Sequence, residues 1–278
     1  MVRAKNCHGQ KNKAHCGYSN PSLIRKKCRV LSFCLVLLFL LTSCVSISGQ
    51  AKIRSSRESV TVWPKAYNDA IKDAINPEPG EIVDNLTPIV QDNPKLAWKV
   101  FDGIPHVLMI SLVGDISYYK DSVGKRYNTM DYYIWVTAVP EIQKLCRKYD
   151  FAGNDLTMRL RQLIGLAPNA KVVAFVEFWV NPEHLFRPAA DNEIDDTTAG
   201  LILPDNTESW YRKWFNELRA AQYFQSENPR HDAYPWTQLG YTYDWGNPDS
   251  EQGLSEFVIK TNSKVIINAI YAIDAYCN

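Results

Sequence analysis

This chain of 278 residues lacks every short motif that commonly identifies an enzyme or a cofactor site. It has no HExxH zinc helix, no GxSxG nucleophile turn, no glycine-rich phosphate loop and no CxxC pair. Beyond residue 43 it has only three histidines, at positions 106, 184 and 231, and their spacing is not that of a metal site. The sequence therefore predicts neither a cofactor nor a bound metal.

Residues 1–43 lack acidic side chains altogether but contain eight Lys or Arg residues. The stretch Val30–Leu41 follows, and it is apolar except for Ser32. A basic flank before a short apolar core is typical of a secretory signal peptide. The apolar stretch is too short to cross a membrane, which takes roughly 20 residues. We therefore expect residues 1–43 to be a signal peptide that export removes.

The apolar stretch ends in Leu41-Thr42-Ser43-Cys44, which resembles the bacterial lipobox. In that motif the chain is cut before the cysteine, which then carries lipid, and several acyl chains hold firmly to a bilayer. This predicts a lipoprotein with palmitate on Cys44, anchored in the bacterial cell envelope at the outer membrane or cell surface. The alternative is an ordinary signal peptide that happens to have a cysteine near its cleavage site.

The rest of the chain lacks a basic excess. Removing the eight basic residues of the leader leaves 23 Lys and Arg against 30 Asp and Glu, a net charge of about −7. This sign argues against nucleic acid as a partner. Only Cys146 and Cys277 remain beyond Cys44. In an exported chain these two fit a single disulfide, or alternatively two buried free thiols.

The sequence shows no internal repeat and no linker after about residue 63. Residues 44–62 are Ser-rich and polar and predict a flexible tether, so residues 63–278 should form one globular domain. Strand and helix periodicities are mixed without regular alternation, which predicts an α+β fold with a mostly antiparallel or mixed sheet packed against helices. We expect strands at 107–112, 132–138 and 171–180. We expect helices at 140–149, from an Asn154 cap to Gly165, and at 208–222. A hairpin should join 255–260 to 264–271, and residues 188–206 should form a surface loop.

Glu177 is the most informative single residue because its strand is apolar on both faces. A buried carboxylate must be paired or have its pKa raised, so we expect Glu177 to contact Arg187, Arg219 or a buried hydroxyl. A structural role is one interpretation. A catalytic role is the other, with Asp244 and Glu256 as further candidates. His184 and Arg187 directly follow the strand and are candidate ligand-binding residues.

The aromatic-rich stretch YPWTQLGYTYDWGNP covers residues 234–248. Tyr and Trp rings can stack on a sugar or an aromatic ligand, and they can equally fill a structural corner. The candidate ligand-binding residues here are Tyr234, Trp236, Tyr241, Tyr243 and Trp245. Tyr241 and Tyr243 alternate with Thr242 and Asp244, which is typical of a strand with one solvated face.

The segments EFWVNPEHLFRP, WFNELRAAQY and YPWTQLGYTYDWGNPDSEQGLSEFVI, with the terminal AYC, resemble a family of uncharacterised exported bacterial proteins. The likeness covers residues from about 80 to 278. It implies export and a single domain but no established activity. Relatives carry an extra cysteine pair near the FRP segment, where this chain has Ala189, so the resemblance leaves Cys146–Cys277 as the available bridge. The expected function is binding of a small molecule, glycan or protein. The alternative is a hydrolase, possibly carbohydrate-active, that uses paired carboxylates.

Overall fold

The structure is a computed structural model, and it describes residues 4–5, 64–148, 155–224 and 233–277. These residues belong to one compact unit, formed by Met1–Cys7 and Val62–Asn278. The expected signal peptide (apart from Ala4 and Lys5), the tether, Cys44 and the Asn154 cap lie outside the described residues. Among the described helices, none has the length and apolar character needed to span a bilayer.

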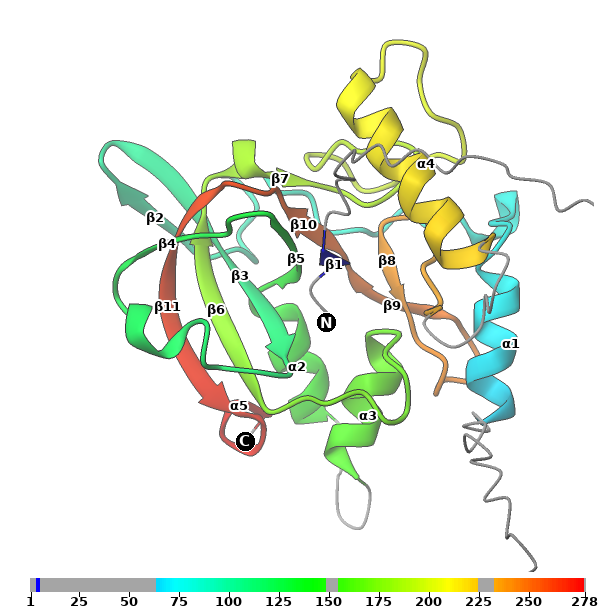
Figure 1. The fold of residues 1–278 in the computed structure, drawn as a ribbon, viewed down its shortest axis with the longest axis horizontal. Helices are drawn as coiled ribbons and strands as arrows, with labels where there is room; N and C mark the ends of the chain where they lie inside the picture. The colour runs from blue at the N-terminus through cyan, green and yellow to red at the C-terminus, as the bar shows by residue number, and fades with distance from the viewer. Residues whose placement is uncertain (1–3, 6–63, 149–154, 225–232, 278) are drawn as a thin grey trace, which may run out of the picture. The chain divides into compact units, whose positions relative to one another are not determined.

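The main sheet is antiparallel in all its strand pairings and follows the order β4-β11-β6-β3-β5-β10-β7, with β2 beside β3 and β1 beside β5 (Figure 1). A second sheet pairs β8 with β9. This architecture confirms the expected α+β class. The strands are β1 (Ala4–Lys5), β2 (Trp98–Phe101), β3 (Ile104–Val113), β4 (Arg126–Asn128), β5 (Tyr132–Ala138), β6 (Ala174–Val180), β7 (Leu185–Phe186), β8 (Tyr241–Tyr243), β9 (Gln252–Ser255), β10 (Phe257–Ile259) and β11 (Lys264–Ala272).

The helices cover the sheet from more than one side. The α-helices are α1 (Lys65–Asp73), α2 (Glu141–Lys148), α3 (Leu156–Leu163), α4 (Ser209–Tyr223) and α5 (Ile273–Cys277). Short 3-10 turns occur at η1 (Pro79–Glu81), η2 (Lys120–Ser122) and η3 (Pro182–His184). In Figure 1, α1 and α4 lie beside β8 and β9, away from α5 at the end of β11.

Strand β6 lies inside the main sheet between β3 and β11, and its alternation divides the core in two. Val176, Phe178 and Val180 enter one apolar cluster with residues of β3, β5, β10 and β11. Phe175 and Trp179 enter another, which residues from α2, α3 and α5 complete. The two faces of β6 are therefore those that the sequence predicts, and both are buried, as expected for an inner strand.

The structure joins Cys146 of α2 to Cys277 of α5 in a disulfide, with their Cα atoms 5.2 Å apart. This separation lies within the range that a disulfide spans. Both cysteines also belong to the apolar cluster between the helices and β6. The bridge therefore ties the last helix of the described chain to the helix that follows β5.

A third cluster is dominated by aromatic rings and lies beneath α1 and α4. Tyr211 and Phe215 of α4 share it with Tyr67 of α1, Trp135 of β5 and Trp236. The rings meet mostly edge to face or tilted, as at Phe215–Trp236 with centroids 5.1 Å apart. Most of the aromatic-rich stretch is thus used to pack two helices onto the sheet.

The predicted hairpin between residues 255–260 and 264–271 is wrong. The segments form β10 and β11, but β10 pairs with β5 and β7, whereas β11 pairs with β4 and β6. The turn between them bonds instead to the β4–β5 connection, through Asn262 N to Met130 O and Thr129 N to Ser263 O. Since each strand finds partners elsewhere in the sheet, the short turn crosses between them rather than closing a pair.

Two local expectations also change. The N-cap of α3 is Asp155, whose side chain accepts a hydrogen bond from Met158 N, rather than Asn154. The expected solvated face of β8 does not exist, because Thr242 and Asp244 are both 3% exposed. Thr242 donates its hydroxyl to Leu163 O, so the polar side of β8 is turned toward α3.

Candidate functional site

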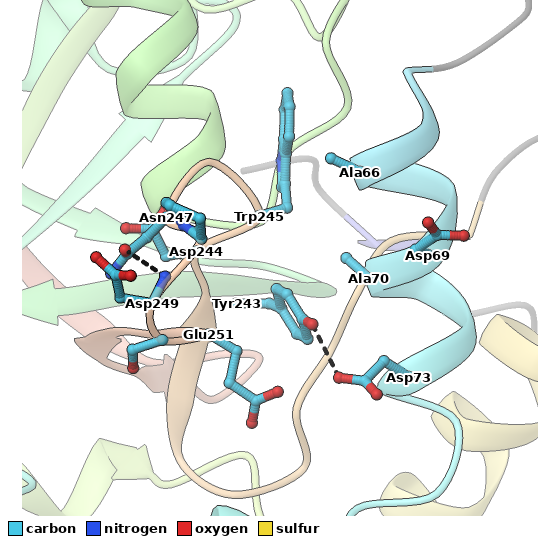
Figure 2. Close-up of a pocket in the computed structure, with 12 residues that line it drawn as sticks. Ala66, Asp69, Ala70, Asp73, Tyr243, Asp244, Trp245, Asn247, Asp249 and Glu251 are labelled. Atoms are coloured by element: carbon cyan, nitrogen blue, oxygen red, sulfur yellow. Dashed lines mark hydrogen bonds between the residues drawn. The ribbon is translucent and has the colours of Figure 1, made fainter.

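A pocket of about 380 Å³ opens between α1 and the turn that connects β8 to β9. Figure 2 shows α1 on one side and the rings of Tyr243 and Trp245 facing it from the other. Ala66 and Ala70 leave room because they present only methyl groups from the helix. The lining residues are Ala66, Asp69, Ala70, Asp73, Tyr243, Asp244, Trp245, Asn247, Pro248, Asp249, Ser250 and Glu251.

The lining is acidic. It contains five carboxylates and no Lys or Arg. Two of the five have cationic partners: Asp69 pairs with Lys65 and Lys72, and Asp244 pairs with Arg159. No described ion pair involves Asp73, Asp249 or Glu251. The pocket therefore keeps an excess of negative charge on the side where these three carboxylates lie.

The ion pair between Arg159 and Asp244 holds the base of the connecting turn. Arg159 Nη1 donates to Asp244 Oδ1 at 2.8 Å, and Nη2 donates to Oδ2 at 2.6 Å. This two-point geometry is the strong form of a charged hydrogen bond. Asp244 also accepts a bond from Gly246 N. Asp244 is thus committed to fixing the turn, so it is poorly placed to act as the catalytic acid or base that the sequence suggested.

Tyrosine hydroxyls hold two of the remaining carboxylates. Tyr243 donates its hydroxyl to Asp73 Oδ2 at 2.8 Å, as Figure 2 shows. Tyr241 Oη lies 2.6 Å from Glu251 Oε1. Burial is the largest influence on the Glu251 carboxyl, and together with a hydrogen bond to Asp73 it raises the pKa of Glu251 to about 7. This carboxyl therefore changes its charge near neutral pH.

Two groups of carboxylates in the described part of the chain have oxygens within 4.8 Å of one another. In the first, Asp73, Glu81 and Glu251, tyrosine hydroxyls occupy positions around the carboxylate oxygens. In the second, Asp191, Glu193 and Asp196, the buried Arg187 guanidinium donates to Asp196 at 2.5 Å. Hydrogen bonds and an arginine account for both groups, so we assign a metal to neither.

Of the five predicted aromatic ligand residues, only Tyr243 and Trp245 line the pocket. Trp236 is 1% exposed, and its Nε1 donates to Pro188 O within the core. Tyr241 is buried, and Tyr234 packs edge-on against Trp135 at 6.0 Å. Tyr234, Trp236 and Tyr241 therefore have structural roles, and only Tyr243 and Trp245 remain candidates for ligand binding. Trp245 is also part of the aromatic core cluster.

His184 and Arg187 do not contribute to this pocket. Arg187 is fully buried and donates to Asp196 and to the carbonyl of Thr198, which fixes the acidic loop after β7. His184 is half-buried, and burial lowers its pKa. Its Nδ1 has no hydrogen-bond partner within the described residues. The Arg187 side chain does pack against Gly240 of the aromatic stretch, but neither Arg187 nor Gly240 lines the pocket.

Glu177 is 5% exposed, as expected, but its partners are not the predicted arginines. It accepts a hydrogen bond from Asn268 Nδ2 at 2.6 Å and lies 3.4 Å from the Tyr276 hydroxyl, so a buried hydroxyl does contribute. Arg187 bonds to the loop after β7, and Arg219 bonds to Ile75 O. Burial raises the pKa of Glu177. Its surroundings belong to β6, β11 and α5, away from the pocket lining.

Glu256 is also deeply buried, at 6% exposure, and forms no hydrogen bond or ion pair with the other described side chains. Burial raises the pKa of Glu256 to about 8. An ionised Glu256 would raise the pKa of Tyr223 and of Tyr234, which belong to the aromatic cluster beneath α1 and α4. The three predicted catalytic carboxylates, Glu177, Asp244 and Glu256, therefore occupy three different surroundings.

Sequence reasoning missed Asp73 and Glu251, the two pocket carboxylates that contact each other. They lie far apart in the chain, at the end of α1 and just before β9. Neither sits in a motif, and each resembles an ordinary surface acid. The one available signal was Tyr243, which the alternation of the aromatic stretch already marked and which bonds to Asp73.

No family model, curated protein or solved structure matches this chain.

Proposed function

We propose that this chain is an exported, lipid-anchored protein of the bacterial cell envelope that binds a small, positively charged ligand in the pocket between α1 and the β8–β9 turn. The basic, apolar leader ending in LTSC supports export and anchoring at Cys44. The likeness to a family of exported bacterial proteins supports the same location. The pocket supports binding rather than catalysis.

The observation that carries the proposal is the composition of the pocket lining. Concave sites that combine aromatic rings with a few convergent polar groups are the usual form of a ligand site. Here the rings of Tyr243 and of the largely buried Trp245 line the pocket, and Asp73, Asp249 and Glu251 offer negative charge to a cation. Ligands with an amine and a short apolar part fit these surroundings, whereas an anionic ligand would be repelled.

A titration of the mature protein, beginning at residue 44, tests this proposal. Spermidine and choline would serve as cationic probes and a neutral polyol as the reference, with affinities measured by calorimetry at pH 8. We expect a cation to bind, and Asp249→Asn to weaken it about three- to tenfold. Glu217→Gln, on the exposed surface of α4 where Glu217 pairs with Lys213, is the matched control and should bind normally. Tighter binding of the polyol than of either cation would contradict the proposed charge preference.

No observation favours the alternative hydrolase over binding. Its predicted carboxylates do not meet, as described above. Asp73 and Glu251 do meet, but they are hydrogen-bonded to each other. Carboxylates that cleave a glycosidic bond stand about 5 Å or more apart, so that the substrate fits between them. Turnover of a chromogenic glycoside that Glu251→Gln abolishes would nevertheless reverse this conclusion.

A further inference from the structure

The carboxylates of Asp73, Glu81 and Glu251 converge at one end of the pocket, and their oxygens lie within 4.8 Å of one another. They come from three segments, the end of α1, η1 and the approach to β9. No Lys or Arg forms a described ion pair with any of the three. Like charges at this distance cannot all be ionised without a large repulsion, so at least one proton is expected among them.

The Tyr241 hydroxyl lies between two oxygens of this group. Tyr241 Oη lies 2.6 Å from Glu251 Oε1 and also 2.9 Å from the carbonyl oxygen of Glu81. The tyrosine has a single hydroxyl proton, and an ionised Glu251 and a carbonyl are both acceptors. This one proton must serve two acceptors, so Tyr241 alone does little to hold Glu251 in its ionised form.

The other titratable neighbours agree with this arrangement. Tyr243 donates its hydroxyl to Asp73 Oδ2. Glu78 lies near Glu81, and burial is the main reason that the pKa of Glu81 is raised. Asp69 and Asp249 add negative charge along the pocket, and only Asp69 is neutralised by lysines. Lys65 and Lys72 pair with Asp69, and Arg159 pairs with Asp244. The other ionisable groups named here are acids or tyrosines, which favours keeping the proton.

We propose that Glu251 and Asp73 share one proton at neutral pH and that a cationic ligand displaces this proton when it binds. The inference rests on the proposed function and adds its regulation: the ligand is held at alkaline pH and released on acidification. The exchange balances, because one proton leaves Glu251 for the solvent as one positive charge of the ligand enters. Acid returns the proton, removes the negative charge and weakens binding.

The proton can be observed without any ligand. In the mature protein labelled with 13C at the glutamate carboxyls, we expect one side-chain signal, lost in Glu251→Gln, to titrate near pH 7. Asp73→Asn removes the neighbouring charge and should move this midpoint down by about one pH unit or more. Glu217→Gln should leave it unchanged. A Glu251 signal that titrates between pH 4 and 5 overturns the shared proton.

The exchange is tested with spermidine as the probe. Affinity of the unsubstituted protein should rise by up to about tenfold per pH unit between pH 5.5 and 7 and then level off, because one proton is released per cation. Glu251→Gln should bind weakly with no such slope. Affinity that is independent of pH overturns proton exchange and leaves the binding function standing. Failure of every amine to bind overturns the binding function, whatever the glutamate titration shows.

Discussion

Arg159 and Asp244 show how single residues build this pocket. Their side chains are 17% and 3% exposed and meet through two short hydrogen bonds at the base of the β8–β9 turn. Asp244→Asn removes one charge of this pair and with it the two-point contact to Arg159. We expect Asp244→Asn to lower the free energy of unfolding by about 3 kcal/mol in urea titrations. Asp102→Asn breaks the exposed pair with Arg126 and is the matched control, with an expected change below about 0.5 kcal/mol. Equal losses in the two variants would contradict this account.

Burial of Glu256 predicts how the free energy of unfolding depends on pH. Its pKa is about 8 in the folded protein, above its ordinary value of 4.5, because it is buried without a described partner. Between these values the unfolded chain has lost the proton and the folded chain keeps it. The free energy of unfolding should therefore fall as pH rises from 5 to 8, by up to about 1.4 kcal/mol per pH unit, and level off above pH 8.

Glu256→Gln should remove this contribution, so its stability should exceed that of the unsubstituted protein increasingly from pH 5 to 8. Urea unfolding at pH 5, 6.5 and 8 measures the difference in free energy of unfolding between the two proteins. The other buried glutamates are present in both proteins, so their contributions cancel in this difference. The free energy of unfolding of Glu217→Gln should have the same pH dependence as that of the unsubstituted protein. If Glu256→Gln and the unsubstituted protein showed the same pH dependence of the free energy of unfolding, the Glu256 carboxyl would be ionised in the folded protein and thus paired.

At the scale of elements, the disulfide joins α2 to α5 across 131 residues of sequence. Closing so long a loop restricts the unfolded chain and contributes about 4–5 kcal/mol in the chain-entropy account. We expect a reductant to lower the urea midpoint of the oxidised protein. The double variant Cys146→Ser, Cys277→Ser should unfold at that lower midpoint with or without reductant. An oxidised protein that unfolds at the same midpoint as the double variant would show that the bridge contributes nothing to stability.

Elements that carry their own signal could be predicted from the sequence. The apolar runs of β3, β5 and β6 and the amphipathic pattern of α4 are local properties, and the structure has them at nearly the expected residues. Which strands pair with β10 and with β11 could not be predicted from the sequence. A turn of three residues resembles a hairpin locally, but here β10 pairs with β5 and β7, and β11 pairs with β4 and β6.

The pocket illustrates the same limit. Tyr243 and Trp245 stood out because aromatic residues are concentrated there. Helix α1 gave no distinctive pattern, and its contact with β8 joins distant parts of the chain. Asp73 and Glu251 become unusual only when folding brings their carboxylates together. A pKa raised by burial and by a neighbouring acid is a property of the arrangement, so no sequence motif records it.

For the molecule as a whole, the leader and the domain have opposite charge. The leader is basic without a single acidic residue, and the rest carries a net charge of about −7. The basic charge thus belongs to the segment expected to direct export. A domain of this charge would be repelled by anionic lipid headgroups. Stable attachment to a membrane would therefore depend on acyl chains, and more than one chain is needed to hold firmly.

Cys44 is the expected site of lipid attachment. In bacteria expressing the protein, we expect labelled palmitate to be incorporated into the unsubstituted chain and the protein to sediment with membranes. Cys44→Ala should lose the label and leave an unprocessed precursor, because the cysteine is both the lipid attachment point and the residue after the cut. The double variant Cys146→Ser, Cys277→Ser keeps Cys44 and should keep the label. Continued incorporation in Cys44→Ala would instead assign the leader to an ordinary signal peptide with its lipid, if any, attached elsewhere.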